Sequence, residues 1–165
     1  MGKSTGKYIY LADRLDLIQE LAGWFFDEWE VHNPDLTLES IENKLKGRLN
    51  REQVPLVLVH IQDGSAIASA SIKIQEMETH PHYQHWLGSV YVIPEFRGQG
   101  IGTELIRYTI GEAKRLAVED LYLYTRNKEI FYSKLGWKSI ESPIYHRRRV
   151  IIMHQKLSVN ERINL

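Results

Sequence analysis

Three glycines at alternate positions follow an arginine in the segment RGQGIGT, residues 97–103. Glycine adopts the left-handed backbone conformations that tight turns need, and it leaves no side chain between a ligand and the main-chain N–H groups. The segment follows the apolar run VYVIP and precedes a run with helical spacing, so we expect it to form the first turn of a helix. Unpaired N–H groups and the helix dipole favour an anion at that place. The sequence therefore predicts an anion site at residues 97–103.

Two nucleotide-binding patterns fit this turn poorly. The dinucleotide pattern Gly-x-Gly-x-x-Gly fails because the third glycine comes one residue early, at Gly102, and Thr103 takes the expected place. A P-loop needs a Lys-Ser/Thr pair after its glycines, and the GKST at residues 2–5 has no strand before it. A turn made only for packing is a simpler alternative, but three glycines and an arginine exceed what such a turn requires.

The pattern Arg-x-x-Gly-x-Gly, formed here by Arg97, Gly100 and Gly102, resembles that of the GCN5-related N-acetyltransferases, the GNAT superfamily. A second segment, FYSKLGW at residues 131–137, is similar to the Phe-Tyr-x-x-Leu-Gly-Phe/Trp segment of that family and lies at the usual distance downstream. The resemblance implies an enzyme that uses acetyl-CoA as its co-substrate.

The resemblance also implies which residues bind acetyl-CoA. The pantetheine arm pairs like an extra strand with Tyr91 and Val92, and the Val92 N–H faces the thioester carbonyl, where it can stabilise an oxyanion. Asn127 is the asparagine assigned to the same arm, although it lies five residues before Tyr132 and many members have seven; Thr125 stands at the family's position. The pyrophosphate is bound by the main-chain N–H groups of Arg97, Gly98, Gln99, Gly100, Ile101, Gly102 and Thr103.

Two catalytic residues are expected. Tyr132 stands where the family carries the acid that protonates the leaving thiolate. An amine nucleophile must also lose a proton, and we expect the base in the loop before strand 86–93, with Glu78 as the chosen candidate. The other candidates in that loop are Glu76, His80, His82 and His85. Three neighbouring histidines invite a metal site, but the chemistry needs none and we expect no metal.

The predicted function is the transfer of an acetyl group to a primary amine, of a small molecule or a peptide, by direct attack through a tetrahedral intermediate. The alternative is a non-catalytic acyl-CoA-binding regulatory module, which has no need of the Tyr132 phenol beside the sulfur. The identity of the acceptor is not readable. We expect the loop at residues 76–86 and the first two helices to line its site.

Composition excludes several classes of function. Lys plus Arg and Asp plus Glu both number 21, so no net charge attracts the chain to nucleic acid or to an anionic membrane. The chain has no cysteine, which excludes a cysteine nucleophile and thiolate metal sites. It has no long apolar run and no signal-peptide pattern, so we expect a cytoplasmic monomer or homodimer. The basic run HRRR at residues 146–149 could attract an acidic substrate or the 3'-phosphate of CoA, but such a run is more often a solvated turn between strands.

The order of the expected elements predicts an α+β fold in a single domain over residues 1–165. The sheet is expected to be mixed, mostly antiparallel and twisted, with about six or seven strands and helices on both faces. Thr37 or Asp35 can cap the second helix, and Asp63-Gly64 is a hairpin signal. The expected strands are 7–12, 54–61, 66–75, 86–93, 120–125, 137–141 and 149–157, and the expected helices are 16–29, 38–49, 102–117 and 128–136.

Overall fold

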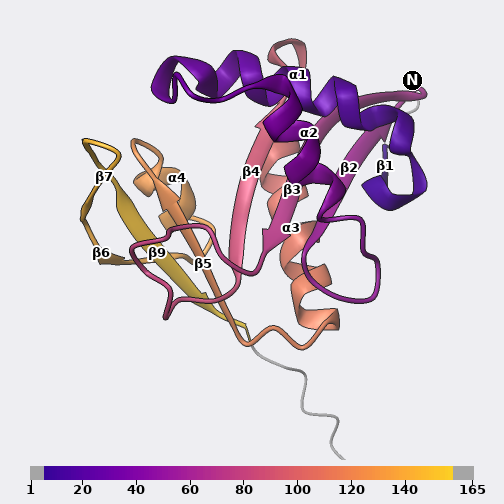
Figure 1. The fold of residues 1–165 in the computed structure, drawn as a ribbon. Coiled ribbons are helices and arrows are strands. Elements are labelled where there is room, and N and C mark those ends of the chain that lie inside the picture. Colours follow the sequence, from indigo (N-terminus) through magenta and orange to yellow (C-terminus); the bar gives the residue numbers. More distant parts are fainter. Residues whose placement is uncertain (1–5, 158–165) are drawn as a thin grey trace, which may run out of the picture.

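Seven strands form one sheet in the order β1-β2-β3-β4-β5-β9-β6 (Figure 1). The computed structural model describes residues 6–157, so the GKST at residues 2–5 lies outside the described part. All neighbouring strands are antiparallel except β4 and β5, and the predicted α+β fold is confirmed. The strands are β1 Lys7–Tyr10, β2 Leu56–Gln62, β3 Ser65–Lys73, β4 Trp86–Val92, β5 Asp120–Thr125, β6 Lys138–Glu141 and β9 Ile151–Lys156.

Helices cover both faces of this sheet, as predicted. Because side chains alternate along a strand, β2 sends Val57 and Val59 to one face and Leu58 to the other. Helices α1 (Ile18–Trp29) and α2 (Leu38–Lys46) pack on the first face, and α3 (Ile101–Arg115) and α4 (Glu129–Ser133) pack on the second. The 3-10 turns are η1 Leu11–Asp13, η2 Leu15–Leu17, η3 Glu30–His32 and η4 Pro94–Phe96.

Helix α2 begins where its sequence predicts. The Thr37 hydroxyl accepts a hydrogen bond from the Ser40 N–H at 3.0 Å, and the Ser40 hydroxyl accepts one from the Thr37 N–H at 3.1 Å. This reciprocal capping satisfies two donors that a helix start leaves free. The helix ends at Lys46, three residues before the predicted end, because Gly47 and Arg48 turn the chain toward β2.

Strands β4 and β5 touch at one end only. Their register has a single partner pair, Trp86 with Tyr122, and the Tyr122 N–H donates to the His85 carbonyl at 2.9 Å. A bulge in the pairing of β3 with β4 follows, at Ser89, whose φ is +49°. Figure 1 shows the two strands diverging beyond this point. The second half of β4 therefore has a neighbour on its β3 side only.

The C-terminal strands differ from the prediction. The expected strand 149–157 is divided at Val150, whose N–H donates to the Pro143 carbonyl at 2.9 Å, into β8 (Arg148–Arg149) and β9. The unpredicted β7 (Ile144–Tyr145) pairs with β8, and the basic run lies at this hairpin with its arginines exposed. His146 and Arg147 both have positive φ, the geometry of a two-residue hairpin turn, which histidine and arginine do not signal. None of the helices within residues 6–157 is long and apolar enough to cross a membrane.

Candidate active site

The glycine turn presents free main-chain donors at the start of α3. Gly98 and Gly100 have φ of +74° and +82°, and no side chain caps the helix. The N–H groups of Arg97 and Glu104 bond to Pro94 and Gly100, but the six N–H groups between them have no acceptor within residues 6–157. A Cβ built on Gly98 or Gly100 meets no atom within 4 Å. The turn therefore leaves six main-chain donors free at a helix start, where the predicted anion would bind.

The Arg97 side chain folds back onto the end of β4. Its Nε donates to the Val92 carbonyl at 2.8 Å, its guanidinium lies 5.3 Å from the centre of the Tyr91 ring, and a terminal nitrogen lies 3.7 Å from Glu28. Tyr91 in turn stacks on Trp24 of α1. Arg97 thus holds the turn against β4, and the main chain remains the source of donors to a ligand.

The Val92 N–H points into the gap between β4 and β5. The Ile93 N–H donates to the Ile67 carbonyl on β3 at 2.9 Å. Residues of an antiparallel pair alternate between bonding to the partner strand and facing away from it. Val92, the partner of Ala68, therefore directs its N–H and carbonyl away from β3. The Arg97 side chain donates a hydrogen bond to the Val92 carbonyl, so the Val92 N–H remains as a free donor in the gap.

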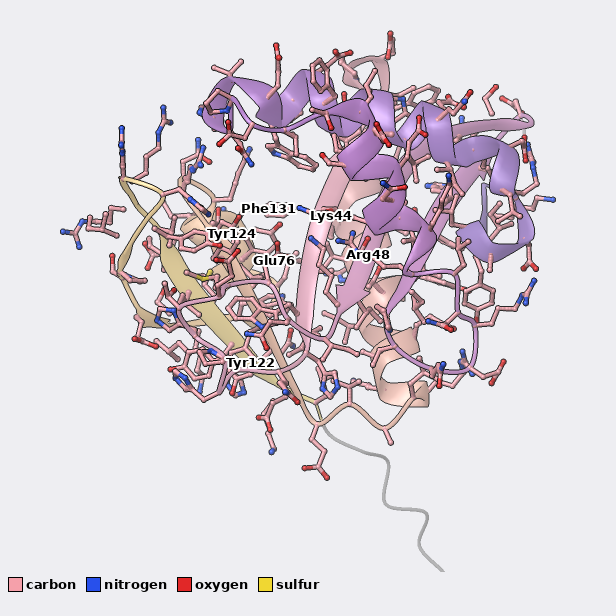
Figure 2. The ribbon with its side chains drawn as sticks, viewed as in Figure 1. Lys44, Arg48, Glu76, Tyr122, Tyr124 and Phe131 are labelled. Atoms are coloured by element: carbon pink, nitrogen blue, oxygen red, sulfur yellow. The ribbon has the colours of Figure 1, made fainter. Side chains whose placement is uncertain are left out.

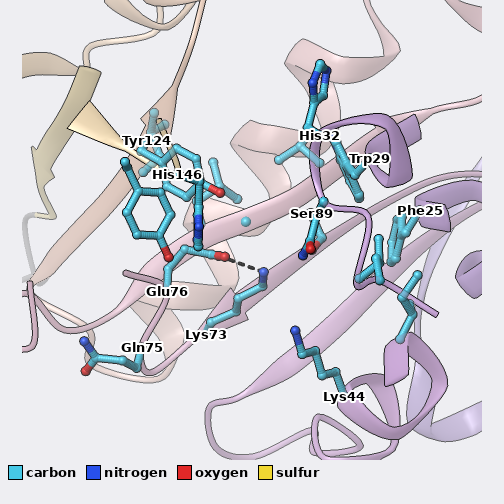
Figure 3. Close-up of a pocket in the computed structure, with 18 of the residues that line it drawn as sticks. Phe25, Trp29, His32, Lys44, Lys73, Gln75, Glu76, Ser89, Tyr124 and His146 are labelled. Atoms are coloured by element: carbon cyan, nitrogen blue, oxygen red, sulfur yellow. Dashed lines mark ion pairs between the residues drawn. The ribbon is translucent and has the colours of Figure 1, made fainter. Parts of the chain in front are cut away.

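A cavity of about 590 Å³ lies beside this gap (Figure 3). Its walls come from α1, η3 and α2 on one side and from β5, α4 and the β7 hairpin on the other, with the second half of β4 and the end of β3 between them. Four lining residues are Lys or Arg and two are Glu. These charged residues are Lys44, Arg48, Lys73, Arg126, Glu76 and Glu78.

Tyr132 lines the cavity together with Val90 and Leu123. Its ring lies edge-on against the buried Trp137, with centroids 6.2 Å apart. Burial raises the pKa of the Tyr132 phenol to about 12. The hydroxyl therefore keeps its proton at neutral pH and can donate a hydrogen bond into the cavity.

Only two of the five candidate bases reach the cavity. Glu76 and Glu78 are among its lining residues, with Glu76 half-buried and Glu78 exposed. The three histidines of the loop do not line the cavity. The Nε2 of His80 lies 3.4 Å from a carboxylate oxygen of Glu141 on β6. No group of three or more His, Cys, Asp or Glu within residues 6–157 could hold a metal ion.

Residues 15–137 match the sequence model of the Acetyltransferase (GNAT) family. The chain belongs to the GNAT family. A curated relative, the aminoalkylphosphonate N-acetyltransferase of Salmonella typhimurium, is 29% identical over 85 residues, which are 47% of this chain and 53% of the relative. The chain thus matches about half the length of that relative.

Solved GNAT structures share the fold of this chain. An aminoglycoside 6'-N-acetyltransferase in complex with coenzyme A is 16% identical with a TM-score of 0.73, covering 93% of this chain and 97% of its own. The yncA protein of Salmonella typhimurium, solved with its cofactor acetyl-CoA, is 17% identical with a TM-score of 0.68, covering 94% and 96%. These findings confirm the GNAT superfamily that the sequence resembles and the predicted enzyme class, an acetyltransferase.

Within this GNAT chain, Asn127 lies in the exposed turn after β5. Like Tyr91, Val92 and residues 97–103, it is not among the residues that line the cavity, whereas Tyr132 and Glu78 are. The Thr125 hydroxyl accepts a hydrogen bond from the Lys128 N–H at 3.0 Å, so it shapes that turn. Tyr122 stacks on Tyr83, with ring centroids 4.5 Å apart, whereas Tyr124 lines the cavity. Burial and the nearby Glu76 carboxylate raise the pKa of Tyr124 to about 12.

Sequence reasoning missed the basic residues of the cavity. Lys73 ends β3 buried, and its Nζ lies 2.7 Å from a Glu76 carboxylate oxygen (Figure 3). A Cβ on Gly88 would lie 2.4 Å from that oxygen, so glycine at this place makes room for the pair. The sequence did carry a signal for Lys73, because a lysine at the end of a strand of small and apolar residues indicates a buried charge. Nothing in the sequence marked Lys44 and Arg48, which come from a helix and the turn after it.

Proposed function

We propose that this protein transfers the acetyl group of acetyl-CoA to a primary amine by direct attack. The observation that carries the proposal is the set of free N–H groups at residues 98–103, together with the Val92 N–H in the gap beside a cavity of about 590 Å³. The first group of donors suits a pyrophosphate and the last suits a thioester oxygen. Family membership and the relatives solved with coenzyme A or acetyl-CoA support the same co-substrate.

The reaction forms an N–C bond and breaks a C–S bond. The neutral amine attacks the thioester carbon, and the oxygen of the tetrahedral intermediate accepts a hydrogen bond from the Val92 N–H. The amine loses one proton to a base, for which Glu78 on the cavity rim is our candidate. The intermediate then collapses to an amide and a thiolate, which takes one proton to become the free thiol of CoA.

Tyr132 is our candidate donor to the leaving sulfur. Its pKa of about 12 lies roughly 3.5 units above that of an ordinary thiol, so full proton transfer in water would be unfavourable. A thiolate formed in the same buried place is also more basic, which narrows the difference. A hydrogen bond from the phenol lowers the energy of the developing thiolate before any transfer is complete.

The relatives support an amine as acceptor. The curated relative is named for an aminoalkylphosphonate, and the structural relatives with coenzyme A include an enzyme for aminoglycosides. The test is an assay of thiol release from acetyl-CoA across a panel of primary amines, followed by mass detection of the amide. Because the chain has no cysteine, the protein adds no thiol signal of its own. Tight binding of acetyl-CoA without any amide product would favour the regulatory module instead.

A further inference from the structure

One side of the cavity carries positive charge that the protein does not neutralise. Lys44 in the last turn of α2, Arg48 in the turn after it, and Lys73 at the end of β3 form what we call the cationic cluster. Only Lys73 has an ion-pair partner, Glu76. Among the residues that the structure describes, neither Lys44 nor Arg48 forms an ion pair or a side-chain hydrogen bond.

The members of the cluster lie close enough to affect one another. Burial lowers the pKa of Lys73, Glu76 raises it, and the charges of Arg48 and Lys44 lower it further. Burial also lowers the pKa of the half-buried Arg48 guanidinium and the charge of Glu76 raises it, and the group stays protonated. Removing a cation from water without a partner costs free energy. Among the three cations this cost falls on Arg48, which is half-buried and has no ion pair within residues 6–157, whereas Lys44 is exposed and Lys73 is paired with Glu76.

The cluster shares its cavity with the proposed reaction centre. Figure 2 shows Lys44 and Arg48 on the α2 side of the gap, with Glu76 and Tyr124 on the side of β5. In Figure 3 the Lys44 side chain extends toward the same space as the Lys73–Glu76 pair. Tyr132 and Val90 line that cavity too. A small molecule can therefore contact the cationic cluster at one end and the acetyl donor at the other.

We propose that the acceptor is an amine that also carries an oxyanion, a carboxylate or a phosphorus oxyanion, which Arg48 and Lys44 bind while the amine points toward the thioester. This inference rests on the proposed acetyltransferase function and names the substrate class for it. A guanidinium offers paired donors that match the geometry of both kinds of oxyanion. Polyamines fit poorly, because their second ammonium group would face Arg48 and Lys44.

The first test compares amines that differ only in the anionic group. O-phosphoethanolamine is paired with ethanolamine, and β-alanine with propylamine, at saturating acetyl-CoA. We expect kcat/KM at least tenfold higher for the anionic member of at least one pair, as charged hydrogen bonds provide. Equal values in both pairs, or a preference for the uncharged amines or a diamine, would overturn the proposal while leaving acetyl transfer intact.

The second test assigns the preference to Arg48. Arg48→Gln removes the charge and keeps a polar side chain, and Lys46→Gln makes the same charge change on the same segment outside this cavity. We expect Arg48→Gln to raise KM for the anionic amine at least tenfold, with KM for acetyl-CoA unchanged, and Lys46→Gln to change neither. An increase in KM for acetyl-CoA alone would assign Arg48 to a CoA phosphate and overturn the proposal.

A binding measurement separates the two hypotheses. Isothermal titration of O-phosphoethanolamine and β-alanine into the protein with bound CoA needs no turnover. Binding of either compound that Arg48→Gln weakens at least tenfold would support the oxyanion site even if no amide forms, in which case the proposed function alone fails. The inference would be overturned if neither compound bound at millimolar concentration. It would also be overturned if both compounds bound and Arg48→Gln changed neither affinity.

Discussion

The proposed site offers donors of two chemical kinds at its two ends, and only the second end is part of the cavity lining. At the start of α3 the donors are main-chain N–H groups of residues 98–103, and the one charged side chain of the turn, Arg97, bonds to β4. At the α2 end the donors are side chains of Lys44, Arg48 and Lys73, brought together from two segments of the chain. The first end depends on the shape of the backbone, and the second depends on charge. Different substitutions should therefore disable them.

The largest effect is expected from Gly100→Val. Gly100 has φ of +82°, which a β-branched residue rarely adopts, and its absent side chain leaves open space at the turn. Since no protein atom would meet the new Cβ, the chain should fold, but the turn would be strained and the phosphate path obstructed. We expect the rise in melting temperature that acetyl-CoA produces to disappear.

Gly111→Ala is the matched control for that substitution. Gly111 lies inside α3, has no positive φ and has free space around it. Alanine should stabilise the helix by about 0.5–1 kcal/mol and leave the acetyl-CoA shift intact. If folded Gly100→Val retained its affinity for acetyl-CoA, the turn would be structural and the contrast between the two ends would be wrong.

The next effect is expected from Tyr132→Phe. The change removes only the hydroxyl, so the packing against Trp137 and the affinity for CoA should remain. Single-turnover acetylation should slow by about 10²-fold, the lower range for a positioned proton donor. Single-turnover rates are the proper measurement because product release can hide a change in chemistry. An unchanged rate would remove Tyr132 from the mechanism and leave water as the donor.

The same contrast explains what could be predicted from the sequence. Glycines at 98, 100 and 102 restrict the backbone locally, so the turn and its free N–H groups follow from spacing alone. The cap at Thr37 is equally local, and it was one of the two predicted candidates. Arg48, which follows α2, and Glu76, which follows β3, line one cavity only because the fold brings the ends of those elements together, and the spacing of residues in the sequence does not predict this. The β7–β8 hairpin was missed because His146 and Arg147 are unusual in its turn.

The Lys73–Glu76 pair offers a test of the charged end through stability. Glu76→Gln leaves the Lys73 ammonium buried beside Arg48 and Lys44 without its carboxylate, so we expect a loss of about 2–4 kcal/mol at pH 7 by denaturant unfolding. The pKa of Lys73 is already lowered and should fall further in the variant. The folded variant then binds fewer protons than the unfolded chain, so its stability should rise with pH below the ordinary lysine pKa.

A control for the pH effect is Lys73→Met combined with Glu76→Gln. Without the lysine, the additional stability at higher pH should vanish, because no buried amine remains to lose its proton. A deficit in Glu76→Gln that stayed constant from pH 7 to about 9.5 would show that Lys73 keeps its charge without help from Glu76.

The smallest effect is expected from Arg48→Met, and its sign is informative. Methionine retains an unbranched apolar side chain but removes a half-buried cation that forms no ion pair within the described chain and interacts with Glu76 only through the charge. Removing such a charge should leave the free energy of unfolding equal to that of the parent or raise it by up to about 1 kcal/mol. The melting temperature should then stay the same or rise slightly. The same variant should lose its preference for anionic amines. If Arg48→Met instead lowered stability by several kcal/mol, then Arg48 would serve the fold, and the charge at the α2 end would need no ligand to explain it.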